Sequence, residues 1–239
     1  MKERGMIFNG EMVRAILDGR KTQTRRPIQW KQTRFTEIGE REDGSRWPWS
    51  EDAEHACDFW HPCPFGTVGD RIWVRETWGV VSHELDEDGR IQPWTPDRPA
   101  KAINEMPFGN GYYSGHAIYA ADGDFTWGDD DGYEDGRSCW KPSIHMPRWA
   151  SRITLEVTNV GVQRLQSISP NDAAREGLVK LPATGRYCIN QGDQYFGGAS
   201  QNAREVFSWL WESIYGADSW KANPWVWVIE FKRVEGGAA

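Results

Sequence analysis

The chain has 239 residues, with 28 Lys and Arg against 35 Asp and Glu, and therefore a formal net charge of −7. This acidic balance argues against a protein that coats duplex DNA without regard to sequence. No run of about 18 apolar residues is present, which excludes a membrane-spanning helix from the sequence. Hydrophobic residues make up only 38% of the chain, but 15 residues are Trp. Because each Trp side chain buries a large area, the chain can still form a hydrophobic core.

The length allows one large domain or two small ones. The four Cys are scattered, and the first residues lack the apolar segment of a secretory signal. Scattered cysteines in a chain of this length are typical of reduced thiols rather than of a disulfide scaffold. We therefore expect a cytoplasmic protein that does not associate with membranes.

The N-terminal region begins with a predicted helix over residues 10–18, because its apolar residues recur at helical spacing. Gly19 is suited to end this helix. Residues 21–26 follow, and Pro27 prevents a long helical continuation. We therefore expect residues 21–26 to be extended or turn-like.

The middle of the chain is polar and rich in turn-forming residues. Residues 31–66 are punctuated by Trp and Pro and are expected to be irregular. Residues 68–80, VGDRIWVRETWGV, alternate as a strand does. The segment at about 82–136 is acidic and rich in Gly, Asp and Pro. It is expected to be a long irregular insertion or lid, with a short strand at 115–121.

The C-terminal half carries the clearest patterns. Residues 152–165 and 224–234 predict strands, and Ser169 before Pro170 predicts the start of a short helix. Residues 202–216 predict an amphipathic helix with an apolar face of Val206, Phe207, Leu210, Trp211 and Ile214. This order of elements predicts a single domain over residues 1–239 of the α+β class, a small and mostly antiparallel β-barrel with flanking helices.

A cationic segment follows the first predicted helix. Arg20, Lys21, Arg25 and Arg26 lie close together in GRKTQTRRPI, with two Thr between them. They can form surface ion pairs worth about 0–1 kcal/mol each. Alternatively, the arginines bind a polar or phosphate-bearing ligand, and their charges lower the pKa of Lys21 until it can activate a Thr hydroxyl. Period-2 counting separates Lys21 from Thr24, so this second interpretation requires a bend.

Residues 55–63, HACDFWHPC, contain four candidate zinc ligands, which are His55, Cys57, His61 and Cys63. Their spacing is not that of a zinc finger or ribbon, and no second ligand pair follows at the usual distance. The Trp and Pro residues favour a packed turn, and we expect neither a metal nor a cofactor.

Residues 143–152 place His145, Arg148, Trp149 and Arg152 just before the predicted strand. Trp and Arg together can stack on a nucleobase and hydrogen-bond it. Alternatively, Trp149 belongs to the core and His145 bonds the local backbone. Both interpretations stay open from the sequence.

Two carboxylates are candidate partners for a catalytic lysine, because a carboxylate beside a lysine can orient it or hold a proton. Glu76 lies in the RETW turn, and Glu176 lies in the short helical segment after Pro170. Each can equally be a solvated acid at the end of an element.

Four segments together resemble the ASCH domain family, in particular its long phage- or prophage-associated members. They are GRKTQTRR (19–26), GDRIWVRETW (69–78), SIHMPRWASRI (143–153) and NPWVWVIEF (223–231). The resemblance covers both ends and the middle of the chain but not the acidic insertion. It implies a β-barrel related to the PUA fold, with a cleft associated with RNA or nucleosides.

Some small ASCH proteins are amidohydrolases that remove the acetyl group from N4-acetylcytidine, using a Lys, a Thr three residues later and a Glu on a later helix. The match in this chain is Lys21, Thr24 and Glu176, with Glu76 in reserve. The resemblance implies that neutral Lys21 deprotonates Thr24, which attacks the acyl carbonyl, and that Glu176 delivers a proton to the leaving nitrogen.

The expected substrate is a nucleoside or RNA, and the residues expected to bind it are Arg20, Arg25, Arg26, Glu76, His145, Arg148, Trp149 and Arg152. Other ASCH proteins look like RNA-binding or RNA-cleaving proteins. A module that binds RNA or a modified nucleotide without turnover, or a ribonuclease, is therefore the alternative.

Overall fold

The structure is a computed structural model and describes residues 1–29, 37–52, 57–108, 111–126 and 140–234. The chain forms two compact units. Unit 1 comprises Met1–Arg4, Ala15–Ile72 and Leu155–Gly236, and unit 2 comprises Gly5–Arg14, Trp73–Thr154 and Gly237–Ala239. The sequence predicted a single domain, and whether the two units fold as one stays a prediction. None of the described helices is long and apolar enough to span a membrane.

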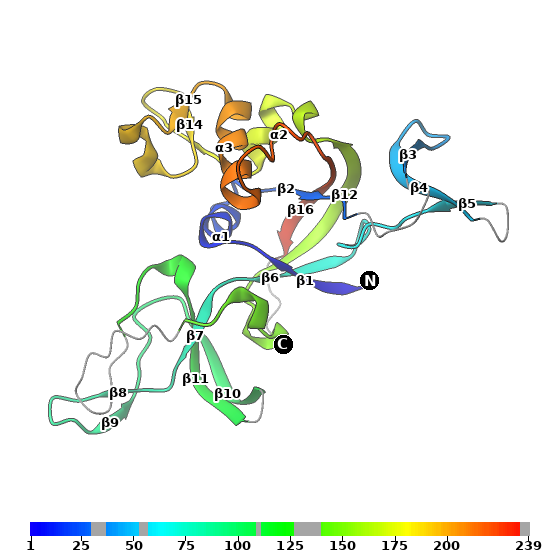
Figure 1. The fold of residues 1–239 in the computed structure, drawn as a ribbon. Helices are drawn as coiled ribbons and strands as arrows, with labels where there is room; N and C mark the ends of the chain where they lie inside the picture. The colour runs from blue at the N-terminus through cyan, green and yellow to red at the C-terminus, as the bar shows by residue number, and fades with distance from the viewer. Residues whose placement is uncertain (30–36, 53–56, 109–110, 127–139, 235–239) are drawn as a thin grey trace. The chain divides into compact units, whose positions relative to one another are not determined.

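The largest sheet has five strands in the order β1-β6-β12-β16-β2 (Figure 1). Their bounds are Glu3–Ile7, Arg71–Arg75, Thr154–Arg164, Trp225–Val234 and Gln23–Pro27, respectively. The strands predicted over 152–165 and 224–234 are thus confirmed. β16 pairs antiparallel with β2, with Glu230 opposite Gln23 and Ile229 opposite Thr24.

The described strands give an α+β protein with mostly antiparallel pairing, as predicted, but no closed barrel is detected among them. Closing a barrel would require the two terminal strands of the sheet, β1 and β2, to pair. Instead, the residues just before β2 hydrogen-bond the C-terminal end of the helix at Pro170–Arg175. Thr22 N–H donates to Arg175 C=O, and Lys21 forms an antiparallel bridge with Glu176.

Two helices of unit 1, α2 (Pro170–Arg175) and α3 (Ala203–Tyr215), lie together on one side of β2 and β16 (Figure 1). Ser169 caps α2 as predicted, because its side chain accepts from Asp172 N–H. The predicted apolar face of α3 is buried at Val206, Phe207, Leu210 and Trp211. Ile214, in the last turn, is 39% exposed and does not belong to that buried face.

Unit 1 also contains two small sheets. β3 (Glu37–Glu40), β4 (Arg46–Asp52) and β5 (Cys57–Trp60) form one, within a region expected to be irregular. The alternation of Trp47 and Trp49 along β4 is a strand signal that the intervening Pro48 obscures. The second small sheet consists of β13 (Val179–Lys180), β14 (Tyr187–Cys188) and β15 (Ala199–Ser200). Two 3₁₀ turns, η4 (Leu165–Ser167) and η5 (Gln191–Phe196), also belong to unit 1.

Unit 2 is built on a second antiparallel sheet in the order β10-β11-β7. Its core contains Trp78, Ile103, Ala117, Tyr119, Met146 and Ala150. The sheet consists of β7 (Trp78–Val81), β10 (Lys101–Phe108) and β11 (Gly111–Tyr119), and β8 (His83–Leu85) and β9 (Ile91–Pro93) form a separate two-stranded sheet. The 3₁₀ turns of unit 2 are η1 (Ala120–Asp122), η2 (Ser143–His145) and η3 (Arg148–Ala150). Helix α1 (Gly10–Leu17), predicted over 10–18, begins in unit 2 and ends in unit 1.

The expectation of an irregular insertion over 82–136 is therefore wrong for much of its described part. β8 to β11 lie there, and the strand expected at 115–121 is found from Gly111 to Tyr119. The Asp, Gly and Pro residues that suggested irregularity form the turns between short strands. Gly115 has φ +107°, and a Cβ there would collide with Val81 C=O on β7, so only glycine fits this crossing.

Candidate functional site

Lys21 is placed by the end of α1 and the end of α2, both within unit 1. Gly19, at φ +73°, turns the chain after α1, and Lys21 N–H donates to Ala15 C=O. Gly177 follows α2 closely, and a Cβ there would lie only 2.8 Å from Ala15 Cβ and 3.1 Å from Lys21 Cβ. The absence of a side chain at Gly177 therefore lets the end of α2 approach Lys21.

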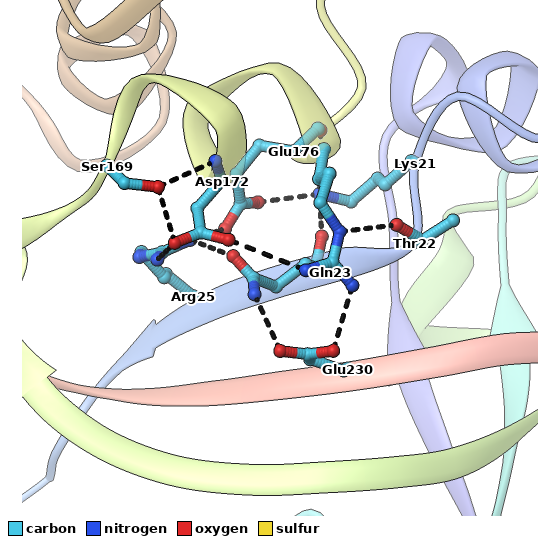
Figure 2. A network of polar contacts seen from close by, with 9 residues as sticks. Lys21, Thr22, Gln23, Arg25, Ser169, Asp172, Glu176 and Glu230 are labelled. Carbon is cyan, nitrogen blue, oxygen red and sulfur yellow. Dashed lines mark hydrogen bonds and ion pairs between the residues drawn. The ribbon is translucent and has the colours of Figure 1, made fainter.

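The amine of Lys21 is completely buried and bonded to three oxygens (Figure 2). Lys21 Nζ lies 2.8 Å from Glu176 Oε2, 2.9 Å from Glu176 C=O and 2.9 Å from Gln23 C=O. These three acceptors match the three N–H groups of an ammonium. The structure therefore brings Lys21 together with Glu176, one of the two carboxylates that the sequence offered as its partner.

Arg25 holds the second oxygen of the same carboxylate, with its Nη1 2.8 Å from Glu176 Oε1. The same nitrogen donates to Gln23 Oε1. Gln163, with its amide oxygen turned toward the guanidinium, accepts from Arg25 Nε at 3.0 Å and Nη2 at 2.7 Å. Lys21, Arg25 and Glu176 form what we call the inner cluster, in which the two oxygens of Glu176 bind two different cations.

A partly exposed layer surrounds the inner cluster. Arg175 Nη2 lies 2.8 Å from Glu230 Oε2, and Gln23 Nε2 donates to Glu230 Oε1 at 3.2 Å (Figure 2). Asp172 lies 4.0 Å from Arg25 Nη2. The side chains of Asp172, Arg175 and Glu230 are 30%, 35% and 26% exposed. These three residues form the outer layer, and they are the part of the network that solvent reaches.

Burial lowers the pKa of Lys21 below its ordinary value, because a charged amine loses its hydration there. The charge and hydrogen bond of Glu176 oppose this effect, and Arg26 and Arg25 add smaller contributions that lower the pKa. The sequence predicted the same direction from the arginines alone. The principal cause is desolvation, which depends on the tertiary structure.

Thr24 is buried but is not among the hydrogen-bond partners of Lys21 Nζ. Side chains alternate along β2, so Thr24 projects to the face opposite that of Gln23 and Arg25. The role of Thr24 as nucleophile stays a prediction without support from hydrogen bonding.

The other two arginines of the cationic segment have separate partners. Arg20 donates to Gly177 C=O and pairs with Asp18 at 2.9 Å. Arg26 lies opposite Trp227 on β16. Burial raises the pKa of the Tyr215 hydroxyl, and the charge of Arg26 partly opposes this. Arg20 therefore helps to hold the turn after α2. Among the described contacts, the cations bonded to the Glu176 carboxylate are Lys21 and Arg25.

Unit 2 contains a different buried network around Glu76. Arg152 Nε and Nη2 lie 3.0 Å from the two carboxylate oxygens of Glu76, and Arg152 also pairs with Asp122 at 2.7 Å. The guanidinium lies over the Tyr119 ring at 3.9 Å. Burial raises the pKa of Glu76, and Arg152 only partly offsets this. Glu176, not the reserve candidate Glu76, is the carboxylate bonded to Lys21.

The remaining predicted substrate-binding residues also belong to unit 2. Trp149 packs edge-on against Trp78, with ring centroids 5.6 Å apart, which fits the core interpretation. Arg148 Nη2 is 3.4 Å from Thr154 Oγ1, and His145 ends the short turn η2. The sequence assigned these residues and Lys21 to one site. The structure describes them in unit 2 and Lys21 in unit 1, and their common site stays a prediction.

The segment HACDFWHPC falls partly outside the described residues, which exclude His55. His61 Nε2 hydrogen-bonds Ser50 Oγ at 2.9 Å, and Cys57 is exposed. Burial raises the pKa of the Cys63 thiol to about 11. Within the described ranges, no three His, Cys, Asp or Glu side chains are grouped so that they could hold a metal ion.

Sequence reasoning missed most of the residues that hold the inner cluster. Gln23 could have been found, because alternate residues of a strand project to the same face and Gln23 lies between Lys21 and Arg25 in that alternation. Gln163 and Glu230 lie on β12 and β16, which are far from β2 in the sequence. Only the pairing of strands in the sheet brings Gln163 beside Arg25 and Glu230 beside Gln23. Comparison with other proteins adds no further residues: no known protein family, no curated protein and no solved structure matches this chain.

Proposed function

We propose that the inner cluster of unit 1 is the active site of a metal-independent amidohydrolase. Its substrate is N4-acetylcytidine or a related N4-acylated cytosine nucleoside, free or in RNA, and the compartment is the cytoplasm. The single observation that carries the proposal is the buried amine of Lys21 at 2.8 Å from Glu176. The resemblance to ASCH proteins, with their PUA-like barrel, supplies the reaction and substrate class.

A buried ion pair is a poor way to stabilise a protein, because removing the charges from water offsets most of their attraction. Ionisable groups with shifted pKa values are concentrated at catalytic sites. The lowered pKa of Lys21 increases the fraction of neutral amine, which is the form that accepts a proton. These properties favour a chemical role for Lys21.

In the proposed reaction, neutral Lys21 takes a proton from the nucleophile as it attacks the acyl carbonyl. The nucleophile is Thr24 Oγ or, because no hydrogen bond joins Thr24 to Lys21, a water molecule. The proton passes from Lys21 to Glu176 across their hydrogen bond, and Glu176 delivers it to the exocyclic nitrogen of cytosine. When water attacks, the products are cytidine and the carboxylic acid. When Thr24 attacks, cytidine leaves and the acyl group stays on Thr24 Oγ as an ester. A water molecule, deprotonated by Lys21, then hydrolyses this ester, which releases the carboxylic acid and restores Thr24.

Arg25 has a positioning role in this scheme. Its donors are already directed to Glu176, Gln23 and Gln163, so it holds the carboxylate rather than the oxyanion of the substrate. Backbone N–H groups are then the expected oxyanion donors, a contribution of about 3–4 kcal/mol when one such donor is removed from known enzymes.

The test is to mix purified protein with N4-acetylcytidine and to follow the ultraviolet absorbance as cytidine forms. We expect turnover by the native chain, its loss in Lys21→Ala, and unchanged turnover in the control Lys221→Ala, which removes an exposed lysine paired with Asp218. Thr24→Ala distinguishes the nucleophiles, because full activity in this variant identifies water. A native protein that leaves the spectrum unchanged contradicts the hydrolase.

The alternative function is an RNA- or modified-nucleotide-binding module without turnover. One observation favours it: every N–H of the Lys21 ammonium is bonded within the chain, as in a purely structural network. Equilibrium dialysis with N4-acetylcytidine separates the two functions. Binding with recovery of intact ligand supports the module, recovery of cytidine supports the hydrolase, and cleavage of an RNA probe indicates the ribonuclease.

A further inference from the structure

Unit 1 contains a cavity of about 820 Å³ that none of the inner-cluster residues lines. Its walls come from the turn between β3 and β4, the end of β5, residues 62–68 and residues 159–162 of β12. Arg46, Thr67 and Val68 are exposed, so the cavity is open to solvent. Its volume falls in the range of about 300–1,000 Å³ that is usual for small-molecule sites.

Two indole rings of the wall are held in place by the surrounding structure. Trp47 Nε1 donates to His61 C=O at 2.7 Å, and the Trp47 ring packs edge-on against Trp227 with centroids 5.0 Å apart. Trp60 lies across Gly39, where a Cβ would come within 3.0 Å of the ring. The rings are therefore positioned before any ligand arrives.

Two arginines stack on aromatic rings beside this cavity. Arg41 Cζ lies 4.2 Å from the Trp47 ring centroid and 5.2 Å from that of Trp60, and Arg46 Cζ lies 5.7 Å from the Trp225 ring centroid. Within the part of the chain that the structure describes, neither guanidinium hydrogen-bonds an acceptor or forms an ion pair. Their N–H donors are therefore available to a ligand.

The charge of the cavity favours an anion. Asp43 is the only acidic residue among the described residues that line it, and its carboxylate accepts from Ser45 N–H at 2.8 Å within the hairpin turn. Guanidinium groups bind phosphate through paired, charge-assisted hydrogen bonds, and indoles stack on nucleobases.

We propose that this cavity binds a phosphate-bearing nucleotide, with the phosphate on Arg41 and Arg46 and the base stacked on Trp60. The shared chemistry is that of a free nucleotide and of a nucleotide within a single strand. The site does not depend on the proposed hydrolase, because the two share no residue.

Isothermal titration calorimetry tests the proposal with four probes: cytidine 5′-monophosphate, cytidine, inorganic phosphate and a short cytidine oligoribonucleotide. Calorimetry is preferable to tryptophan fluorescence, because 15 Trp make a change in emission impossible to assign. We expect the monophosphate to bind at least tenfold more tightly than cytidine or phosphate. Cytidine lacks the charge-assisted phosphate contact and phosphate lacks the stacked base, and the loss of either contact weakens binding by about this factor. Tighter binding of the oligoribonucleotide assigns the site to a strand, and tighter binding of the monophosphate assigns it to a free nucleotide.

Variants locate the binding. Trp60→Ala is expected to weaken monophosphate binding about 5- to 100-fold through lost stacking, and Arg41→Gln to weaken it and reduce its salt dependence. Arg46→Gln, at an exposed position, provides the test should Trp60→Ala fail to fold, which circular dichroism reports. The matched control is Arg90→Gln, which removes the same charge from an exposed arginine in unit 2.

Three results overturn the proposal. The first is that the native chain binds neither the monophosphate nor the oligoribonucleotide. The second is that the native chain binds them, but the variants Arg41→Gln and Arg46→Gln bind them as tightly as the control Arg90→Gln does. The third is equal affinity for inorganic phosphate and the monophosphate, which shows a simple anion site without base recognition.

Discussion

Each unit buries a glutamate in an ion-pair network, and the two networks differ in the chemistry that their cationic groups allow. In unit 1 the oxygens of Glu176 bind Lys21 and Arg25, and in unit 2 both oxygens of Glu76 bind Arg152. Burial lowers the pKa of Lys21, whereas the hydrogen bonds to Glu76 and Asp122 raise the pKa of Arg152 against the effect of burial. An amine that gives up its proton more readily can serve as a base, and a guanidinium cannot. Burial of charge alone therefore does not identify a catalytic site.

Lys21→Arg is expected to have the largest effect on this comparison. It keeps the positive charge but replaces the group that titrates, so deacetylation should fall about 100- to 10,000-fold, the usual contribution of general acid–base catalysis. Steady-state rates with N4-acetylcytidine measure the loss. Activity within a factor of a few of the native value would remove the chemical distinction between the two networks.

Glu176→Gln and Glu76→Gln form a matched pair for stability and activity. Loss of the Glu176 charge leaves Lys21 and Arg25 buried without their carboxylate, and we expect about 3–5 kcal/mol of destabilisation together with loss of activity. Arg152 keeps Asp122 when Glu76 is replaced, so about 1–3 kcal/mol and retained activity are expected there.

Urea unfolding of each variant, followed by circular dichroism, measures these free energies. The comparison breaks down if Glu76→Gln abolishes deacetylation in protein that is still folded. It also breaks down if Glu176→Gln leaves the reaction unaffected.

The pH dependence follows from the lowered pKa of Lys21. Because the folded chain binds fewer protons at this amine than the unfolded chain, the free energy of unfolding rises with pH between the folded and unfolded pKa values. The value of kcat/KM should rise through the folded pKa as the amine becomes neutral. In Lys21→Met this contribution to the stability profile should vanish, which urea unfolding at several pH values tests against the native chain.

Arg175→Gln is expected to have the smallest effect. It removes the partly exposed pair between Arg175 and Glu230 in the outer layer, which is worth about 0–1 kcal/mol. Thermal unfolding measures this change at low and high salt. A loss greater than the one found for Glu176→Gln would show that the outer layer, not the inner cluster, governs the stability of this network.

Local patterns were sufficient for several elements. The helix at Gly10–Leu17, the strands at Thr154–Arg164 and Trp225–Val234 and the cap at Ser169 follow from hydrophobic spacing and from backbone preferences that act over a few residues. The strands within 82–136 were mostly missed, because turn residues dominate the local signal while burial against β7 determines the pairing.

The sequence by itself determined that a lysine and several arginines follow the first helix, and that Lys21, Gln23 and Arg25 share one parity. Alternation likewise places Thr24 on the opposite face. Only the tertiary structure decided that Glu176 meets Lys21 and that Gln163 and Glu230 support them. The reason is physical: alternation along a strand is a local property of the backbone. Desolvation of an amine and the choice of its carboxylate depend on segments more than 130 residues apart in the chain.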